Sequence, residues 1–99
     1  MNTIKINTLE FAIDTYGKNT YLSEGTIVSN ASCSTTVADI DALNELMEDT
    51  ITQIQIYHDN ELIYNLQNLN AQITSINEYL NDDHMRYDIN FTFNETLST

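Results

Sequence analysis

The sequence predicts an α+β protein that is mainly β: an antiparallel sheet of about five to six strands, or a small sandwich, with one amphipathic helix packed on it. Three observations predict this class. In residues 51–66, Ile54 and Ile56 alternate with polar residues in the period of two that marks a half-buried strand. Residues 85–93 repeat this alternation. Residues 37–49 instead carry apolar side chains at helical spacing.

The first third of the chain predicts strands. Residues 3–16 form either one bent strand or two short ones, because the parity of the apolar positions changes at Asn7-Thr8, where a bulge or tight turn would absorb the slip. Residues 16–19 predict a turn, and a second strand is expected from about Thr20 to Cys33. The later inward-facing side chains of that strand are small, so we expect the helix to pack closely over them.

The predicted helix covers residues 37–49, with Thr36 as its N-cap. One face carries Ile40, Leu43, Leu46 and Met47, and the opposite face carries Asp41, Glu45, Glu48 and Asp49. The last two acids lie in the final turn, where the helix dipole disfavours them by up to about 1 kcal/mol each. This acidic face either serves an interaction or reflects the absence of selection against it.

Residues 51–66 predict a hairpin whose turn has two possible lengths. A two-residue turn would pair His58 with Glu61, and a three-residue loop would pair Ile56 with Tyr64. The longer loop is favoured because it gathers the better apolar set on one face. It requires Glu61 to adopt a left-handed conformation, which glycine or asparagine prefers.

The last third also predicts β-structure. Residues 68–81 have apolar positions at helical spacing, but their β-branched residues favour a strand over a helix. A turn is expected at residues 81–84, followed by the final strand at 85–93. The chain is short enough for one domain, residues 1–94, and residues 95–99 are expected to form a flexible tail.

Composition limits the classes of partner. Fifteen acids face three bases, Lys5, Lys18 and Arg86, which gives a net charge of −12. This charge opposes binding to nucleic acid or to an anionic membrane and favours a basic partner, a cation or solubility alone. The single Cys33 excludes an intramolecular disulfide and is interpreted as a small strand residue. Because no leader and no long apolar run is present, we expect no signal peptide and a cytoplasmic or virion location.

No motif in the sequence predicts catalysis or a cofactor, so we expect a non-enzymatic protein. The polar groups that invite a metal hypothesis are His58-Asp59 and Asp82-Asp83-His84. They would form a two-histidine, two-carboxylate site only if the two turns met in space. His58 and His84 are therefore weak candidates, and no metal is predicted.

Two functions remain open. The short, proline-free composition, rich in Asn, Ile and Thr, is typical of small phage or prophage proteins. The favoured function is therefore an interaction or assembly subunit, such as a virion component, whose sheet edges and patch at Tyr57 and Ile63 contact neighbouring copies.

The alternative is a small acidic inhibitor that mimics DNA, as some anti-CRISPR proteins do, and blocks a basic host protein. Its candidate residues are Asp41, Glu45, Glu48, Asp49, Asp59, Glu61, Asp82 and Asp83. One continuous acidic stripe would favour the inhibitor. Dispersed acids beside a bare apolar patch would favour the assembly subunit.

Overall fold

The computed structural model describes residues 1–36, 39–67 and 70–94. Within them the chain forms eight strands and one helix, so the predicted mainly β α+β class is confirmed, with more strands than the expected five to six. The elements are β1 (Asn2–Ile6), β2 (Leu9–Ile13), β3 (Thr15–Ser23), β4 (Thr26–Thr35), α1 (Ile40–Met47), β5 (Ile54–His58), β6 (Glu61–Leu66), β7 (Ala71–Asn81) and β8 (His84–Asn94).

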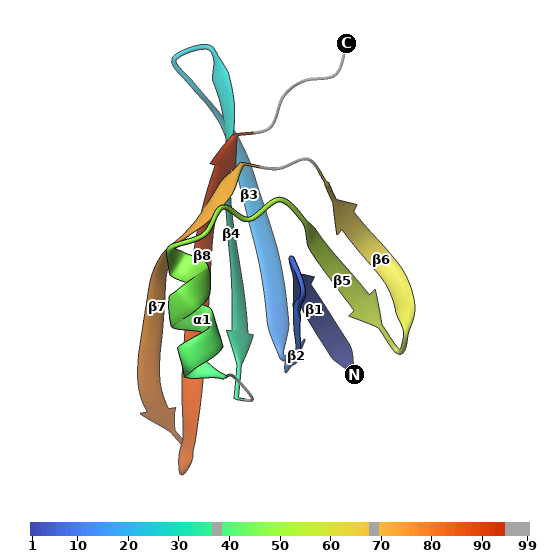
Figure 1. Ribbon diagram of the computed structural model, residues 1–99, viewed down its shortest axis with the longest axis vertical. Coiled ribbons are helices and arrows are strands. Elements are labelled where there is room, and N and C mark those ends of the chain that lie inside the picture. Colours follow the sequence, from blue (N-terminus) through green and yellow to red (C-terminus); the bar gives the residue numbers. More distant parts are fainter. Residues whose placement is uncertain (37–38, 68–69, 95–99) are drawn as a thin grey trace.

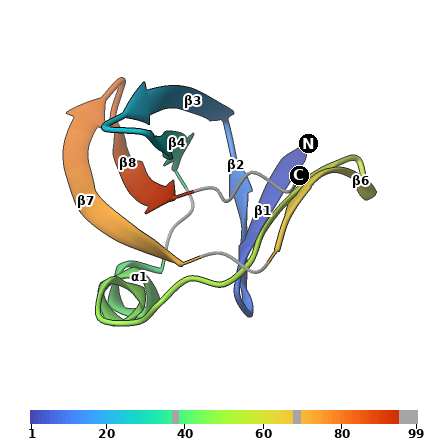
Figure 2. The same ribbon diagram turned by 90° about the horizontal axis from the view of Figure 1, so that it is seen from above.

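The strands form two antiparallel sheets of four (Figure 1). The first sheet has the order β2-β1-β5-β6, and the second has the order β3-β4-β8-β7. Viewed from above, the second sheet curls around one side of the molecule, and α1 lies beside β7 (Figure 2). β6 is the outermost strand on the opposite side.

The N-terminal segment forms two short strands, one of the two predicted arrangements. The chain reverses at Asn7-Thr8, where Asn7 takes a left-handed φ of 54°. In β1–β2 pairing, Ile4 faces Phe11, and both side chains are buried. The tight turn therefore absorbs the parity change and keeps both apolar sets on one face.

The predictions for residues 16–33 were wrong in their boundaries. The expected turn at 16–19 lies inside β3, where Gly17 pairs with Ser32 as an ordinary strand residue. The chain turns instead at Glu24-Gly25, with φ values of 52° and 81°. Gly25 supplies the left-handed conformation that this turn needs, and it divides the expected single strand into two.

The β5–β6 turn contradicts the predicted three-residue loop. Asp59 and Asn60 form a two-residue turn with φ values of 48° and 70°, and His58 pairs with Glu61. Both central residues are left-handed, as type I′ hairpin turns require, and Asp and Asn tolerate that conformation. Glu61, which the longer loop would have forced into it, begins β6 instead.

A bulge reconciles this short turn with the apolar pattern. Ile56 still faces Tyr64, as predicted, but the next pair is Tyr57 with Leu62. Ile63 is therefore the extra residue of β6 at the bulge. The bulge shifts the register by one position, so the inner pairs keep their apolar face despite the shorter turn.

The C-terminal hairpin follows the sequence pattern closely. The ambiguous stretch forms strand β7 over residues 71–81, whereas residues 68–69 lie outside the described residues. The turn to β8 is Asp82-Asp83, with φ values of 50° and 63°. The tail prediction for 95–99 also falls outside the described residues.

Helix α1 begins at Ile40 with Asp39, not Thr36, as its N-cap, and it ends at Met47, two residues before the predicted end; residues 37–38 of the prediction lie outside the described residues. The Asp39 side chain accepts a hydrogen bond from the Ala42 backbone N–H at 3.2 Å, which satisfies a donor of the first turn. Leu43 and Leu46 are buried. No helix in the described part of the chain is long and apolar enough to cross a membrane.

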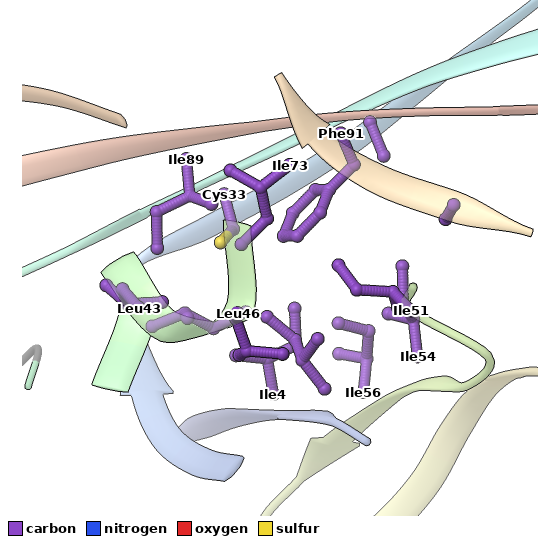
Figure 3. Close-up of a cluster of buried hydrophobic side chains, with 14 of the residues drawn as sticks. Ile4, Cys33, Leu43, Leu46, Ile51, Ile54, Ile56, Ile73, Ile89 and Phe91 are labelled. Atoms are coloured by element: carbon purple, nitrogen blue, oxygen red, sulfur yellow. The ribbon is translucent and has the colours of Figure 1, made fainter. Parts of the chain in front are cut away.

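The two sheets and the helix share one hydrophobic cluster (Figure 3). The first sheet contributes Ile4 and the second contributes Cys33, while Leu43 and Leu46 enter from α1. The remaining members are Ile6, Phe11, Ile13, Ala31, Ile51, Ile54, Ile56, Ala71, Ile73, Ile89, Phe91 and Phe93. The inner faces of both sheets are thus occupied, and candidate binding surfaces must lie on outer faces, edges and grooves.

Candidate functional site

An apolar patch lies at the free edge of the first sheet. It consists of Tyr57 on β5 and of Leu62 and Ile63 on β6, and we call it the β6 patch. Leu62 and Ile63 are 43% and 58% exposed, and no other strand of the described residues lies beyond β6 (Figure 1). Exposed apolar residues on an edge strand are unusual because they invite pairing with another chain.

Tyr57 lies on the outer face of the first sheet, half-buried and outside the hydrophobic cluster. Its hydroxyl donates a hydrogen bond to Oε1 of Gln55 at 3.2 Å, and Nε2 of Gln55 donates to Oδ1 of Asn65 at 3.2 Å. These bonds hold the ring in place beside Leu62. The β6 patch is therefore a preformed surface.

The candidate acids fall into three separate groups (Figure 1). One group surrounds α1, another the β5–β6 turn of the first sheet, and the third occupies the β7–β8 turn of the second sheet. The groups are Asp41, Glu45, Glu48 and Asp49; Asp59 and Glu61; and Asp82 and Asp83, all exposed. The structure does not bring them together as one stripe.

Asp59 already has local partners. Its Oδ1 accepts a hydrogen bond from the Met1 ammonium, and its Oδ2 lies 3.4 Å from Nε2 of His58. The hydrogen bond from the ammonium, followed by the charges of the ammonium and His58, lowers the pKa of Asp59. Asp59 is therefore compensated within the chain, unlike a carboxylate presented to a partner.

The two histidines lie at the ends of hairpins in different sheets, well apart in Figure 1. Nδ1 of His58 lies 2.7 Å from Oδ1 of Asn2, so this ring already has a hydrogen-bond partner. Among the described residues, no group of three or more His, Cys, Asp or Glu side chains is placed to hold a metal ion. The condition that the two turns meet is not fulfilled.

A groove of about 270 Å³ separates α1 from the β1–β2 turn, and we call it the α1 groove. Apolar side chains, including the buried Ile6 and Leu46, form what we call its floor, and polar groups make up the larger part of the exposed lining. Glu45 and Asp49, both exposed, line it from the helix. The other lining residues are Asn7, Thr8, Leu9 and Ala42.

Asn7 fixes the wall of the α1 groove opposite the helix. Its Nδ2 donates to the carbonyl of Thr50 at 3.2 Å, and its Oδ1 accepts from the backbone N–H of Thr52 at 2.9 Å. The backbone N–H of Asn7 donates to the carbonyl of Gln53 at 3.0 Å. The β1–β2 turn is thus tied to the segment that directly follows α1.

Sequence reasoning missed two components of these surfaces. Leu62 joins Tyr57 and Ile63 only because the bulge shifts the register of β6. The spacing of Ala42, Glu45, Leu46 and Asp49 indicates one helix face, but no sequence signal places the β1–β2 turn opposite that face.

No protein-family model matches the chain, and no curated protein matches it in sequence.

Proposed function

We propose that this protein is a non-enzymatic assembly subunit that pairs with neighbouring copies of itself through the β6 patch. The observation that carries the proposal is the exposed apolar patch on an edge strand that nothing in the described chain covers. A strand from another copy would add to this edge by backbone hydrogen bonds, with Leu62 and Ile63 supplying apolar contact. A phage virion component is the class of assembly subunit that the composition favours.

Two of the other three sheet edges, β2 and β7, have neighbours, which supports this choice, and the remaining edge is β3 with its exposed Tyr21 and Leu22. β4 lies against β2, where Thr35 Oγ1 donates to the carbonyl of Ala12 at 2.6 Å and the Asp14 N–H donates to the carbonyl of Ser34 at 2.8 Å. α1 lies against β7. β6 lacks a comparable neighbour on its outer side (Figure 2).

The charge distribution also supports contact through strands. The eight strands contain four acids, Glu10, Glu61, Glu78 and Asp88, and all three bases, so their net charge is 3 − 4 = −1. The other acids of the described residues lie in turns and around α1. Two copies that each carry −12 repel least where their strands meet.

Light scattering of the purified protein, at about 50 mM and about 500 mM salt, tests this proposal because it compares weak with strong screening. We expect a discrete oligomer that survives the higher salt, and a monomer for Ile63→Lys. Leu80→Lys is the matched control, since Leu80 is 69% exposed on the edge strand β7, and it should assemble like the wild type. A wild-type monomer at both salts would refute the proposal, and so would equal disruption by the control.

The second candidate function is the acidic inhibitor. The observation that favours it is the exposed acidic side of α1, where Asp41, Glu45 and Glu48 have no ion pair within the described residues. It predicts a monomer or small dimer that binds a basic, nucleic-acid-handling protein and releases it as salt is raised. Binding that is unchanged at about 500 mM salt would contradict it.

A further inference from the structure

The α1 groove combines two chemical features in one place. Its floor consists of the half-buried side chains of Leu9 and Ala42 above the buried Ile6 and Leu46, and the carboxylates of Glu45 and Asp49 line it from the helix side. Glu45 lies in α1 and Asp49 just beyond its end, and both line the groove. A ligand that fits this groove has an apolar body and a positive end.

Lysine and arginine side chains have this shape, because they bury their methylene stems along apolar surfaces while the charged head stays at the edge. We infer that the α1 groove binds a lysine or arginine side chain of a protein partner, with its stem over the floor and its head between Glu45 and Asp49. The inference uses residues outside the β6 patch and does not depend on self-assembly.

The groove is built before any ligand arrives. The Asn7 side chain ties the β1–β2 turn to Thr50 and Thr52 through three hydrogen bonds of 2.9 to 3.2 Å. Ile51, which lies between Thr50 and Thr52, is fully buried and exchanges backbone hydrogen bonds of 2.9 and 3.0 Å with Ala71. Both walls are thus anchored, so a bound side chain does not have to order the site.

The two carboxylates are unfavourably placed in the free protein. Glu45 and Asp49 are like charges that line the same groove, and like charges repel each other. Asp49 also follows the last turn of α1, where the dipole disfavours an acid. A cation bound between Glu45 and Asp49 reduces both unfavourable interactions, and this reduction contributes to the free energy of binding.

A second copy of this chain is a poor source of that cation. Arg86 donates to Oδ2 of Asp14 at 2.6 Å, and Nζ of Lys18 lies 5.6 Å from the centre of the Tyr64 ring. Lys5 lies opposite Glu10 across β1 and β2. These are all the lysines and arginines of the chain, so the partner is a different, basic protein.

A titration followed by amide chemical shifts in NMR tests this inference on the intact protein. The probe is the blocked tripeptide acetyl-Leu-Arg-Leu-amide, and its control contains citrulline, the uncharged isostere of arginine. We expect saturable shifts around residues 6–9 and 42–49 with arginine only. The double variant Glu45→Gln/Asp49→Asn should bind about fivefold more weakly, as expected from the loss of two exposed ion pairs.

The matched control is Asp82→Asn/Asp83→Asn, which removes the same charge at the distant β7–β8 turn. It should leave the affinity unchanged, and so should Ile63→Lys, which separates this test from that of self-assembly. Circular dichroism checks that each variant keeps its fold. Equal weakening by the control, equal binding of the citrulline peptide, or the absence of saturable shifts around the groove would each overturn the inference.

Discussion

At the scale of single residues, Cys33 shows how burial determines chemistry. The side chain is 1% exposed on β4, and burial, assisted by the charge of Asp88, raises its pKa to about 12. The thiolate is the reactive form of cysteine, and in the folded protein it is scarce at neutral and mildly alkaline pH. The structure thus agrees with the interpretation of Cys33 as a small packing residue.

We predict that a thiol reagent such as DTNB labels Cys33 slowly in native protein at pH 8 and rapidly in denaturant. The same pKa predicts that stability falls as pH rises above 9, because the thiol of the unfolded chain ionises there and the folded one does not. Denaturant unfolding of wild type and Cys33→Ala between pH 8 and 10 isolates this effect. Fast labelling of the native protein would contradict the account.

Asn7 has two roles that different substitutions can separate: it adopts a left-handed backbone conformation, and its side chain forms hydrogen bonds. Asn7→Gly keeps the left-handed conformation easy but loses the side-chain bonds to Thr50 and Thr52, so we expect a loss of about 1 to 2 kcal/mol. Asn7→Ala loses the same bonds and also strains the backbone, which adds about 1 kcal/mol. Urea unfolding of both variants measures the two losses. Equal stabilities would show that the backbone conformation contributes nothing.

At the scale of elements, the N-terminus of α1 is stabilised by its neighbouring residues, whereas its C-terminus is destabilised by them. Asp39 caps the first turn, whereas Glu48 and Asp49 follow the last one. We predict that Asp49→Lys stabilises the protein by about 1 kcal/mol, because it creates an attractive pair with Glu45 and suits the dipole. The same variant should lose binding of the arginine peptide, since its own cation competes for Glu45. Thermal unfolding and the NMR titration measure the two effects, and a gain in stability with unchanged binding would contradict the groove inference.

The β7–β8 turn gives a second prediction for an element. Asp82 and Asp83 both have positive φ, and Asp-Gly is a preferred sequence for this type of turn. Asp83→Gly should therefore raise the free energy of unfolding by about 0.5 to 1 kcal/mol. Urea unfolding measures the change, and the same substitution at Asp88, a β8 strand residue, should destabilise the protein.

The elements also show what the sequence reveals. Alternation predicted β5, β6 and β8, and the β-branched residues correctly favoured a strand for β7. The β5–β6 turn was misjudged because apolar pairing was assumed to extend unbroken to the turn, whereas the bulge at Ile63 separates the two. The turn at Glu24-Gly25 was missed because Gly17 was interpreted as the turn residue of this region.

At the scale of the whole molecule, the acids are concentrated outside the strands, which leaves the sheets nearly neutral. The sequence reveals the total charge, but not that the eight candidate acids lie in three separate groups. Tyr57 and Ile63 were predicted as a patch from the hairpin alone. The α1 groove depends on contacts between segments more than 40 residues apart, such as Asn7 with Thr50, and local patterns do not encode these contacts.

The central claim is that copies of the chain pair through β6, and amide hydrogen exchange at increasing protein concentration tests it most directly. We predict that the amides of residues 61–66 become more protected as concentration rises, since edge N–H groups gain partners only in the assembly. Amides of β7, the edge strand beside α1, should not change. Concentration-independent exchange in β6, or protection that rises first in β7, would contradict the account.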